Sequence, residues 1–189
     1  QPLFNYFKQL FAQVTNPPID AMREEIVTDT TVYVGSDGNL LEEKAENCRV
    51  LEIKNPILTS LELMQIRNMK RPGFKVETVS LLYYKNSSLK NAVDRLFIEC
   101  DRAYRDGANV IILSDRGVDE YHMAIPSLLA VSAMEQYLVR TKKRTAVSII
   151  LESAEPRDVH HFATLLGYGA RAINPYLAQE CVAELVEKN

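Results

Sequence analysis

Short apolar runs alternate with longer amphipathic segments through the second half of the chain. Residues 109–113 (NVIIL) form an apolar run, which is typical of a strand buried on both faces of a parallel sheet. Three further strands are predicted at residues 75–83, 147–151 and 170–173. A segment with apolar residues at helical spacing follows each strand, so the pattern predicts four successive βα units.

The first two helices of these units have recognisable ends. Ser87 or Ser88 is expected to cap a long helix, and Gly107 is expected to end it. Pro126 opens the next helix, which runs to about residue 142. This second helix is apolar nearly all round and rich in small residues, so we expect it to be buried.

The last two helices are predicted at residues 153–166 and 177–187. Ser153 can cap the first of them, with Pro156 tolerated in its first turn. Together with the strands on either side, the first of these helices forms one βαβ unit with two parallel strands.

The first third of the chain gives weaker signals. An opening segment carries three phenylalanines on a helical stripe, Asp20 can cap a short helix, and Thr59 forms a capping-box motif with Glu62. The expected elements are a helix at 3–13, a helix at 20–26, a strand at 47–54 and a helix at 59–68.

The order of elements predicts an α/β fold built from parallel βα repeats. Units of about 30 residues suit a segment of a (βα) barrel and a doubly wound sheet alike. Four units cannot close an eight-stranded barrel, so either further strands join them or the barrel is incomplete. The length of 189 residues is sufficient for one domain with a substantial core.

Composition narrows the class of protein. The apolar fraction of 47% with 25% charged residues is ordinary for a globular protein. A net charge of −3 argues against a basic nucleic-acid surface, and the clusters at 70–71 and 140–144 are too short to change that. No apolar run reaches membrane-spanning length and no signal peptide is visible. We therefore expect neither nucleic acid nor a membrane as a partner.

Cysteine usage points to a reducing compartment. Cys48, Cys100 and Cys181 lie far apart, and none belongs to a CxxC pair, so this chain alone is not expected to hold a zinc or iron–sulfur site. Cys100 falls on the apolar stripe of a predicted helix and is expected to be a buried thiol.

Polar residues follow each predicted strand, and parallel strands end on the same side of a sheet. Tyr83, Tyr84 and Lys85 follow the first strand; the other candidates for this rim are Ser114, Asp115 and Arg116 after the second strand, Glu152 and Ser153 after the third, and Asn174 and Tyr176 after the fourth. Such a rim could form an active site or an ion-pair network that ties loops together. Because no nucleophile–base pair is visible, the network is favoured, and no catalytic, cofactor-binding or metal-binding residue is assigned.

Two other motifs carry little chemistry. His160 and His161 are adjacent in a predicted helix and point about 100° apart, so they do not suit one metal ion; one exposed and one half-buried histidine are expected. Gly167 and Gly169 form a GxG motif that precedes a strand, whereas a phosphate loop follows one. These glycines are expected to end a helix in a tight turn.

Several long segments resemble the central domain of the glutamate synthase large chain. They are LFNYFKQLFAQVTNPPID (3–20), NPIL (55–58), ILSDR (112–116), AIPSLLAVSA (124–133) and ESAEPRDVHHFATLLGYGARAINPYLA (152–178). The resemblance extends over essentially the whole chain, with the segments in the same order. The chain begins at Gln1 without methionine, so we expect residues 1–189 to be this domain without its N-terminal part.

The resemblance implies a fold and a role. The family's central domain is similar to an incomplete (βα) barrel that binds no cofactor. It connects an N-terminal glutaminase domain to an FMN-binding synthase domain and helps to wall the tunnel that carries ammonia between them. FMN and an iron–sulfur cluster are expected in the parent chain, not in this part of it, and the location is expected to be the cytoplasm or the plastid stroma.

The resemblance also limits what can be assigned. The family's glutaminase cysteine is N-terminal, where this chain has Gln1, and the cluster-binding cysteine motif is absent. This part alone is therefore expected to be inactive. Two alternatives remain open: a small stand-alone α/β enzyme that uses Asp115, Arg116 and Glu152, and a ligand-binding module that uses the same rim.

Overall fold

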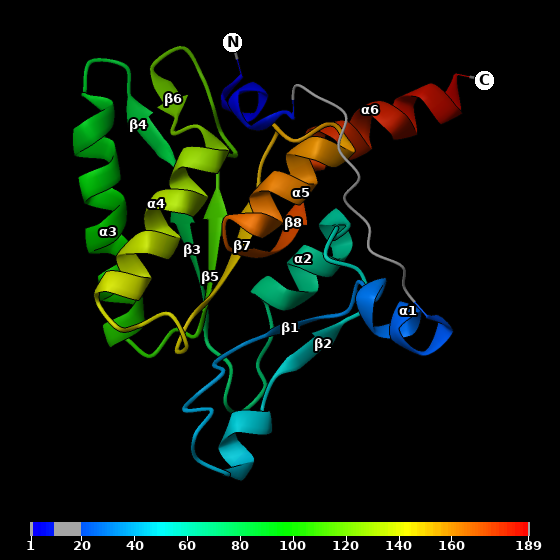
Figure 1. The fold of residues 1–189 in the computed structure, drawn as a ribbon. Coiled ribbons are helices and arrows are strands. Elements are labelled where there is room, and N and C mark those ends of the chain that lie inside the picture. Colours follow the sequence, from blue (N-terminus) through cyan, green and yellow to red (C-terminus); the bar gives the residue numbers. More distant parts are fainter. Residues whose placement is uncertain (1, 10–19, 189) are drawn as a thin grey trace.

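A computed structural model describes residues 2–9 and 20–188, and its centre is a four-stranded parallel sheet (Figure 1). The strands are β3 (Val76–Ser80), β5 (Val110–Ser114), β7 (Ser148–Glu152) and β8 (Ala170–Asn174), and they lie side by side in that order. Every residue of β5 and β7 is buried. This confirms the α/β class, because apolar runs of this kind require cover on both faces of the sheet.

Three helices cover one face of the sheet: α3 (Leu89–Arg105), α4 (Ser127–Arg140) and α5 (Val159–Gly167). Alternate strand residues, such as Ile111, Leu113 and Leu151, form one core cluster with buried residues of these helices. Each helix connects two successive strands, as the βα pattern predicts. The buried side of α4 carries Ala130 and Val131, and Met134 and Leu138 continue it.

The opposite face of the sheet packs against a smaller cluster. Ile112 and Ile150 of the sheet meet Leu63 and Ile66 of α2 (Ser60–Arg67) there. Val34 of β1 (Val32–Val34) completes this core, and β1 pairs antiparallel with β2 (Leu51–Ile53). The capping box of Thr59 and Glu62 opens α2 as predicted.

The predicted strand at 75–83 is in fact two strands. β3 ends at Ser80, and β4 (Leu82–Tyr84) pairs antiparallel with β6 (His122–Ala124) in a separate ribbon. Leu81 is fully buried between the two sheets. Its N–H donates to the carbonyl of Ser114 at 2.8 Å, and its carbonyl accepts from Ile125 at 3.0 Å. These bonds to two different partners end the parallel ladder at this point.

The chain reaches the sheet on the side of β8. Ile57 forms an isolated parallel bridge with Ile173, and the N–H of Leu58 donates to the carbonyl of Ile173 at 2.8 Å. The chain then crosses through α2 to β3 at the other edge of the sheet.

Two predictions near the N-terminus have different outcomes. The predicted helix at 3–13 is a short 3-10 helix, η1 (Leu3–Phe7), and residues 10–13 lie outside the described residues. Asp20 caps α1 (Ala21–Val27) as predicted, accepting from the N–H groups of Met22 and Arg23. A second 3-10 helix, η2 (Ala45–Cys48), precedes β2.

The helix α5 (Val159–Gly167) begins later than the predicted start at residue 153, and the last helix begins one residue earlier than predicted. Ser153 does not cap α5; Asp158 does, accepting from the N–H of His161. The last helix, α6, spans Tyr176–Glu187. Gly169 has φ of +120° and ends the α5 connection as predicted, whereas Gly167 is the last residue of the helix without a positive φ. Within residues 2–9 and 20–188, no helix is both long and apolar enough to cross a membrane.

Candidate functional site at the carboxyl ends of the strands

Seven of the ten predicted rim residues lie together at the carboxyl end of the sheet. Ser114, Glu152 and Asn174 are the last residues of β5, β7 and β8. The parallel register pairs Ser114 with Glu152, and Glu152 with Asn174. Asp115, Arg116, Ser153 and Tyr176 follow directly in the chain. Tyr83, Tyr84 and Lys85 are not part of this group, because β3 ends before them and β4 carries the two tyrosines into the separate ribbon.

Glu152 is the centre of the first half of the rim. Its side chain is only 3% exposed. One carboxylate oxygen accepts from the Ser114 hydroxyl at 2.6 Å and from Nη2 of Arg67 at 2.7 Å, and the other accepts from Nε of Arg116 at 2.7 Å. A buried carboxylate is thus matched by two guanidinium groups and a hydroxyl, which is what burial of a charge requires.

Asp115 is the centre of the second half. One of its carboxylate oxygens accepts from the Ser153 hydroxyl at 2.6 Å, and the other accepts from the Tyr176 hydroxyl at 2.9 Å. The N–H of Ala154 donates to both oxygens at 3.1 and 3.2 Å. The backbone N–H of Asp115 donates to the carbonyl of Glu152, and this bond links the two halves of the rim through the backbone.

Arg116 joins the two halves through its side chain. The guanidinium carbon lies 3.9 Å from the centre of the Tyr176 ring while Nε bonds Glu152. A stacked guanidinium keeps its in-plane donors available for a carboxylate. A weaker contact of 3.8 Å runs from Nη1 to Glu180 on the exposed side of α6.

Asn174 ties the rim to the loop before α2. Its side chain is fully buried, and its amide donates to the carbonyl of Leu58 at 2.9 Å and to the side chain of Gln179 at 3.3 Å. Gln179 donates to the same carbonyl at 2.9 Å. The rim therefore fastens β8, α6 and the segment beside Ile57 to one another.

The carboxylates and hydroxyls of the rim are engaged with one another. Both carboxylates use both of their oxygens as acceptors for groups of the same rim, and each hydroxyl of Ser114, Ser153 and Tyr176 donates to one of them. A general base needs a free lone pair directed at a substrate, and a nucleophilic hydroxyl needs such a base beside it. Among the described residues, no three histidine, cysteine, aspartate or glutamate side chains are grouped so that they could hold a metal ion.

Sequence comparison places the chain in a family. The profile of the glutamate synthase central domain matches residues 1–189. The chain belongs to the glutamate synthase central domain family. This confirms the resemblance found in the sequence.

Several much longer proteins contain a segment similar to this chain. The chain is 47% identical to the NADPH glutamate synthase large chain of Bacillus subtilis over 178 residues, 94% of this chain and 12% of that one. It is 43% identical to the NADH glutamate synthase of Schizosaccharomyces pombe over 192 residues, 99% of this chain and 9% of that one. It is 42% identical to the ferredoxin-dependent glutamate synthase 2 of Synechocystis over 188 residues, 96% of this chain and 12% of that one. The chain thus spans about a tenth of the length of these relatives.

The two buried carboxyls of this central domain have pKa values that move in opposite directions. Burial raises the pKa of Asp115, although the hydrogen bonds from Ser153 and Tyr176 oppose the shift. Burial would also raise the pKa of Glu152, but the Ser114 hydroxyl and the guanidinium groups of Arg116 and Arg67 outweigh it and lower the pKa. Burial and the nearby Asp115 carboxylate raise the pKa of the Tyr176 hydroxyl, so it stays a hydrogen-bond donor.

The lowered pKa of Glu152 predicts a specific pH dependence of stability. Its contribution is complete above its unfolded pKa of about 4.3 and is lost as the pH falls through the lower folded pKa. The raised pKa of Asp115 acts in the other sense, because its ionisation weakens the fold as the pH rises. We expect Glu152→Gln to lose less stability than the unchanged chain between about pH 5 and pH 3. Urea unfolding at each pH measures the difference, and parallel curves for the two proteins would contradict the prediction.

Sequence reasoning missed Arg67 as a member of the rim. Arg67 is the last residue of α2 and lies 85 positions before Glu152. Its place in the last turn of a capped helix is a visible signal, but only the packing of α2 under the sheet shows which carboxylate it reaches.

The histidines and Cys100 lie away from the rim. His160 and His161 are both half-buried, so the expected exposed histidine is not found. His161 stacks on Phe4 with ring centres 4.3 Å apart, and His160 contacts the carbonyl of Phe4 at 2.9 Å. Both rings therefore hold η1 against α5. Cys100 is buried as predicted, and burial raises its pKa to about 12.

Proposed function

We propose that this chain is the non-catalytic central domain of a glutamate synthase. In this role it holds a glutaminase domain and an FMN-binding synthase domain in a fixed relation. It also forms part of the wall of the tunnel through which ammonia passes between them, so that neutral ammonia is not lost to bulk water. The observation that carries the proposal is the closed hydrogen bonding of the rim, where a catalytic domain of this class would keep reactive groups free.

The topology supports a partial (βα) barrel. Successive strands are neighbours in the sheet, and α3, α4 and α5 all pack on one face of it. A doubly wound sheet distributes its helices over both faces, whereas a barrel keeps them outside. The helix α2, which packs on the opposite face, is the element that departs from a closed barrel. Ile57, which precedes the first βα unit, pairs beside the last strand, as the first strand of a closing barrel does. We propose that the domain is such a barrel, left incomplete between α2 and β3.

The rim is proposed as the structural joint of this partial barrel. Its seven residues link four elements through charges and hydroxyls that satisfy one another. A stand-alone enzyme or a ligand-binding module would present several such groups to another molecule. Among the described rim atoms, the buried Oδ1 of Asn174 lacks a partner, whereas both carboxylates and the three hydroxyls are engaged.

The cofactors are proposed to lie elsewhere in the parent chain. An iron–sulfur cluster needs closely placed thiolates, whereas Cys48 and Cys181 are exposed, distant in sequence and separate from the buried Cys100. At the rim, Glu152 occupies the Nε donor of Arg116. The relatives' names include NADPH-, NADH- and ferredoxin-dependent enzymes, so they do not select an electron donor. We propose the cytoplasm as the location of the parent chain, or the plastid stroma in a photosynthetic eukaryote.

Coupling of the two half-reactions tests the connecting role. In the full-length enzyme, Asp115→Ala is expected to lower the melting temperature and the ratio of glutamate formed to glutamine hydrolysed. Glutamate synthesis from added ammonia should continue, because the synthase domain carries that chemistry. Glu180→Ala is the control, since Glu180 makes only a long exposed contact with Arg116. Loss of ammonia-dependent synthesis in Asp115→Ala at an unchanged melting temperature would instead identify the rim as catalytic.

A further inference from the structure

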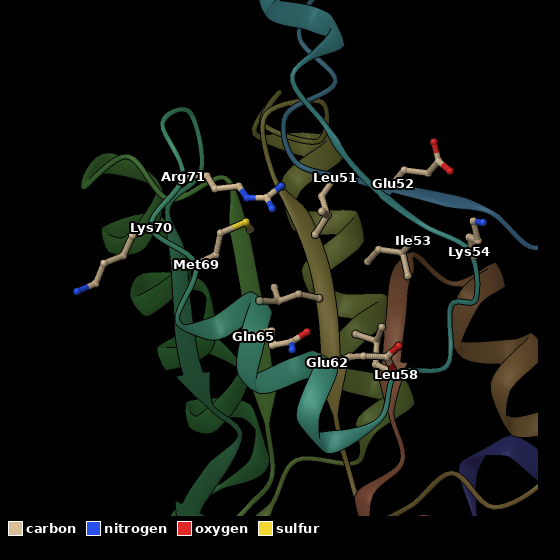
Figure 2. A pocket seen from close by; sticks show the side chains of 11 residues that line it. Leu51, Glu52, Ile53, Lys54, Leu58, Glu62, Gln65, Met69, Lys70 and Arg71 are labelled. Carbon is tan, nitrogen blue, oxygen red and sulfur yellow. The ribbon is translucent and has the colours of Figure 1, made fainter.

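A groove of about 620 Å³ separates β2 from α2 on the side of the sheet opposite α3, α4 and α5 (Figure 2). Leu51 and Ile53 of β2 point toward α2, and Gln65 and Met69 face them from the helix side. Leu58 and Ile66, which belong to the smaller core cluster, also line it. The groove is thus a continuation of the hydrophobic core that reaches the surface.

Charged residues also line the groove: Glu52, Lys54, Glu62, Lys70 and Arg71. Glu62 is engaged by the N–H of Thr59 in the capping box. Among the cations, Arg71 is the one directed across the groove. Figure 2 shows the side chain of Arg71 extending toward Leu51, whereas Lys70 points away from the groove. In residues 2–9 and 20–188 the ion pairs do not include Arg71 or Lys70. A guanidinium beside an apolar surface suits a carboxylate that arrives with an apolar body.

Large apolar side chains are also exposed on the surface around the groove. α2 is apolar on two sides: Leu63 and Ile66 are buried, while Leu61 is 59% and Met64 50% exposed. From position 20 to position 54, only Val34 and Gly35 are buried. α1 has no buried residue at all, and its Met22 is 87% exposed. Within residues 2–9 and 20–188, this face of the sheet is covered by α2 and the β1–β2 pair, and no layer of three helices lies on it as on the other face.

We propose that this groove is the docking site of another segment of the same polypeptide, an apolar segment that carries a carboxylate for Arg71. The inference rests on the proposed function, in which most of the parent chain lies outside residues 1–189. A small ligand could fill the groove but would leave Leu61, Met64 and the residues before β2 uncovered. Surfaces this apolar are typical of permanent interfaces rather than of transient ones, and a covalently linked segment is always present at high effective concentration.

Methionine oxidation in the full-length enzyme tests whether the groove is covered. Met64 and Met123 are 50% and 49% exposed in this domain, Met69 lines the groove, and Met134 is fully buried. We expect dilute hydrogen peroxide to oxidise Met64 and Met69 about tenfold more slowly than in the urea-unfolded enzyme, because a docked segment excludes solvent. Met134 provides the fully protected standard. Oxidation of Met64 at the rate of a half-exposed methionine would overturn the proposal.

Site-specific cross-linking identifies the occupant. A photo-reactive amino acid at position 65 of the full-length enzyme is expected to cross-link within one chain, to a peptide outside residues 1–189. The same amino acid at position 98 of α3, on the opposite side of the sheet, is the control for non-specific capture. A cross-link between two copies, or none above the control, would contradict docking by the same chain.

A pair of charge reversals tests the role of Arg71. Arg71→Glu is expected to reduce the cross-link yield several-fold and to restore oxidation of Met69, because it places like charges together. Lys70→Glu is the matched control, since its side chain points away from the groove. Equal effects of the two variants would contradict the proposal that the docked segment places a carboxylate beside Arg71. Because neither readout depends on turnover, a failure of docking is distinguishable from a failure of the connecting role, which is measured by coupling.

Discussion

Replacing Glu152 with alanine is expected to lower the free energy of unfolding by about 2–3 kcal/mol. The substitution removes a carboxylate that is 3% exposed and that accepts from Ser114, Arg67 and Arg116. Loss of one partner of a buried pair is costly because the groups left behind lose their compensation. Arg67 and Arg116 are 35% and 41% exposed, so each can turn toward water, which places the expected loss at the lower end for buried pairs. Urea unfolding at neutral pH measures it.

Glu180→Ala is the matched control for this prediction. Glu180 lies 3.8 Å from Arg116 with its side chain 61% exposed, and a surface pair of this kind contributes about 0–1 kcal/mol. Glu152→Gln should fall between the two alanine variants, because the amide keeps one acceptor oxygen but not the charge. A loss in Glu152→Ala as small as in Glu180→Ala would show that the rim does not hold the strand ends together.

The strands and helices that could be predicted are those whose local pattern agrees with their surroundings. β5 and β7 are apolar because both faces of the sheet are covered. The cap of α2 follows from residues three positions apart, Thr59 and Glu62. In these segments the tertiary structure adds burial to a preference that the sequence already has.

Other elements depend on contacts that no local pattern contains. The strand predicted at 75–83 is rich in β-forming residues throughout. It nevertheless divides at Leu81, because Ser114 and Ile125 bond the two backbone groups of Leu81 from different sides. Ser153 has the chemistry of a helix cap, but its hydroxyl donates to Asp115 and Asp158 caps α5 instead. A side chain with two suitable partners cannot be assigned without knowing which partner is near.

The rim shows the same division between local and distant information. The parallel order of strands places Ser114, Glu152 and Asn174 together, because parallel strands end on one side. The sequence does not show that Arg67 approaches from α2, nor that Arg116 stacks on Tyr176. These two contacts occupy the groups that a catalytic reading would use. The choice between an active site and a structural joint therefore depends on the residues that arrive from elsewhere in the chain.

Replacing Leu96 with alanine is expected to lower the free energy of unfolding by about 2–5 kcal/mol. Leu96 lies on α3, is fully buried, and belongs to the cluster that joins this helix to the sheet and to α4. Alanine removes its buried apolar surface and leaves a cavity, because the strands and neighbouring helices are fixed by their own ladders and caps. Urea unfolding of the 189-residue chain measures the loss, with an unchanged dependence on denaturant showing that the unfolded state is the same.

Ile98→Ala on the same helix separates packing from helix propensity. Ile98 is 66% exposed, and alanine is the better helix former, so this variant is expected to change stability by less than about 0.5 kcal/mol. Both substitutions shorten a large aliphatic residue of α3 to alanine, two positions apart, and differ in what the side chain contacts. If Leu96→Ala were as mild as Ile98→Ala, the covered face of the sheet would not be the main source of stability. The groove side, with its smaller cluster around Ile112 and Ile150, would then have to supply it.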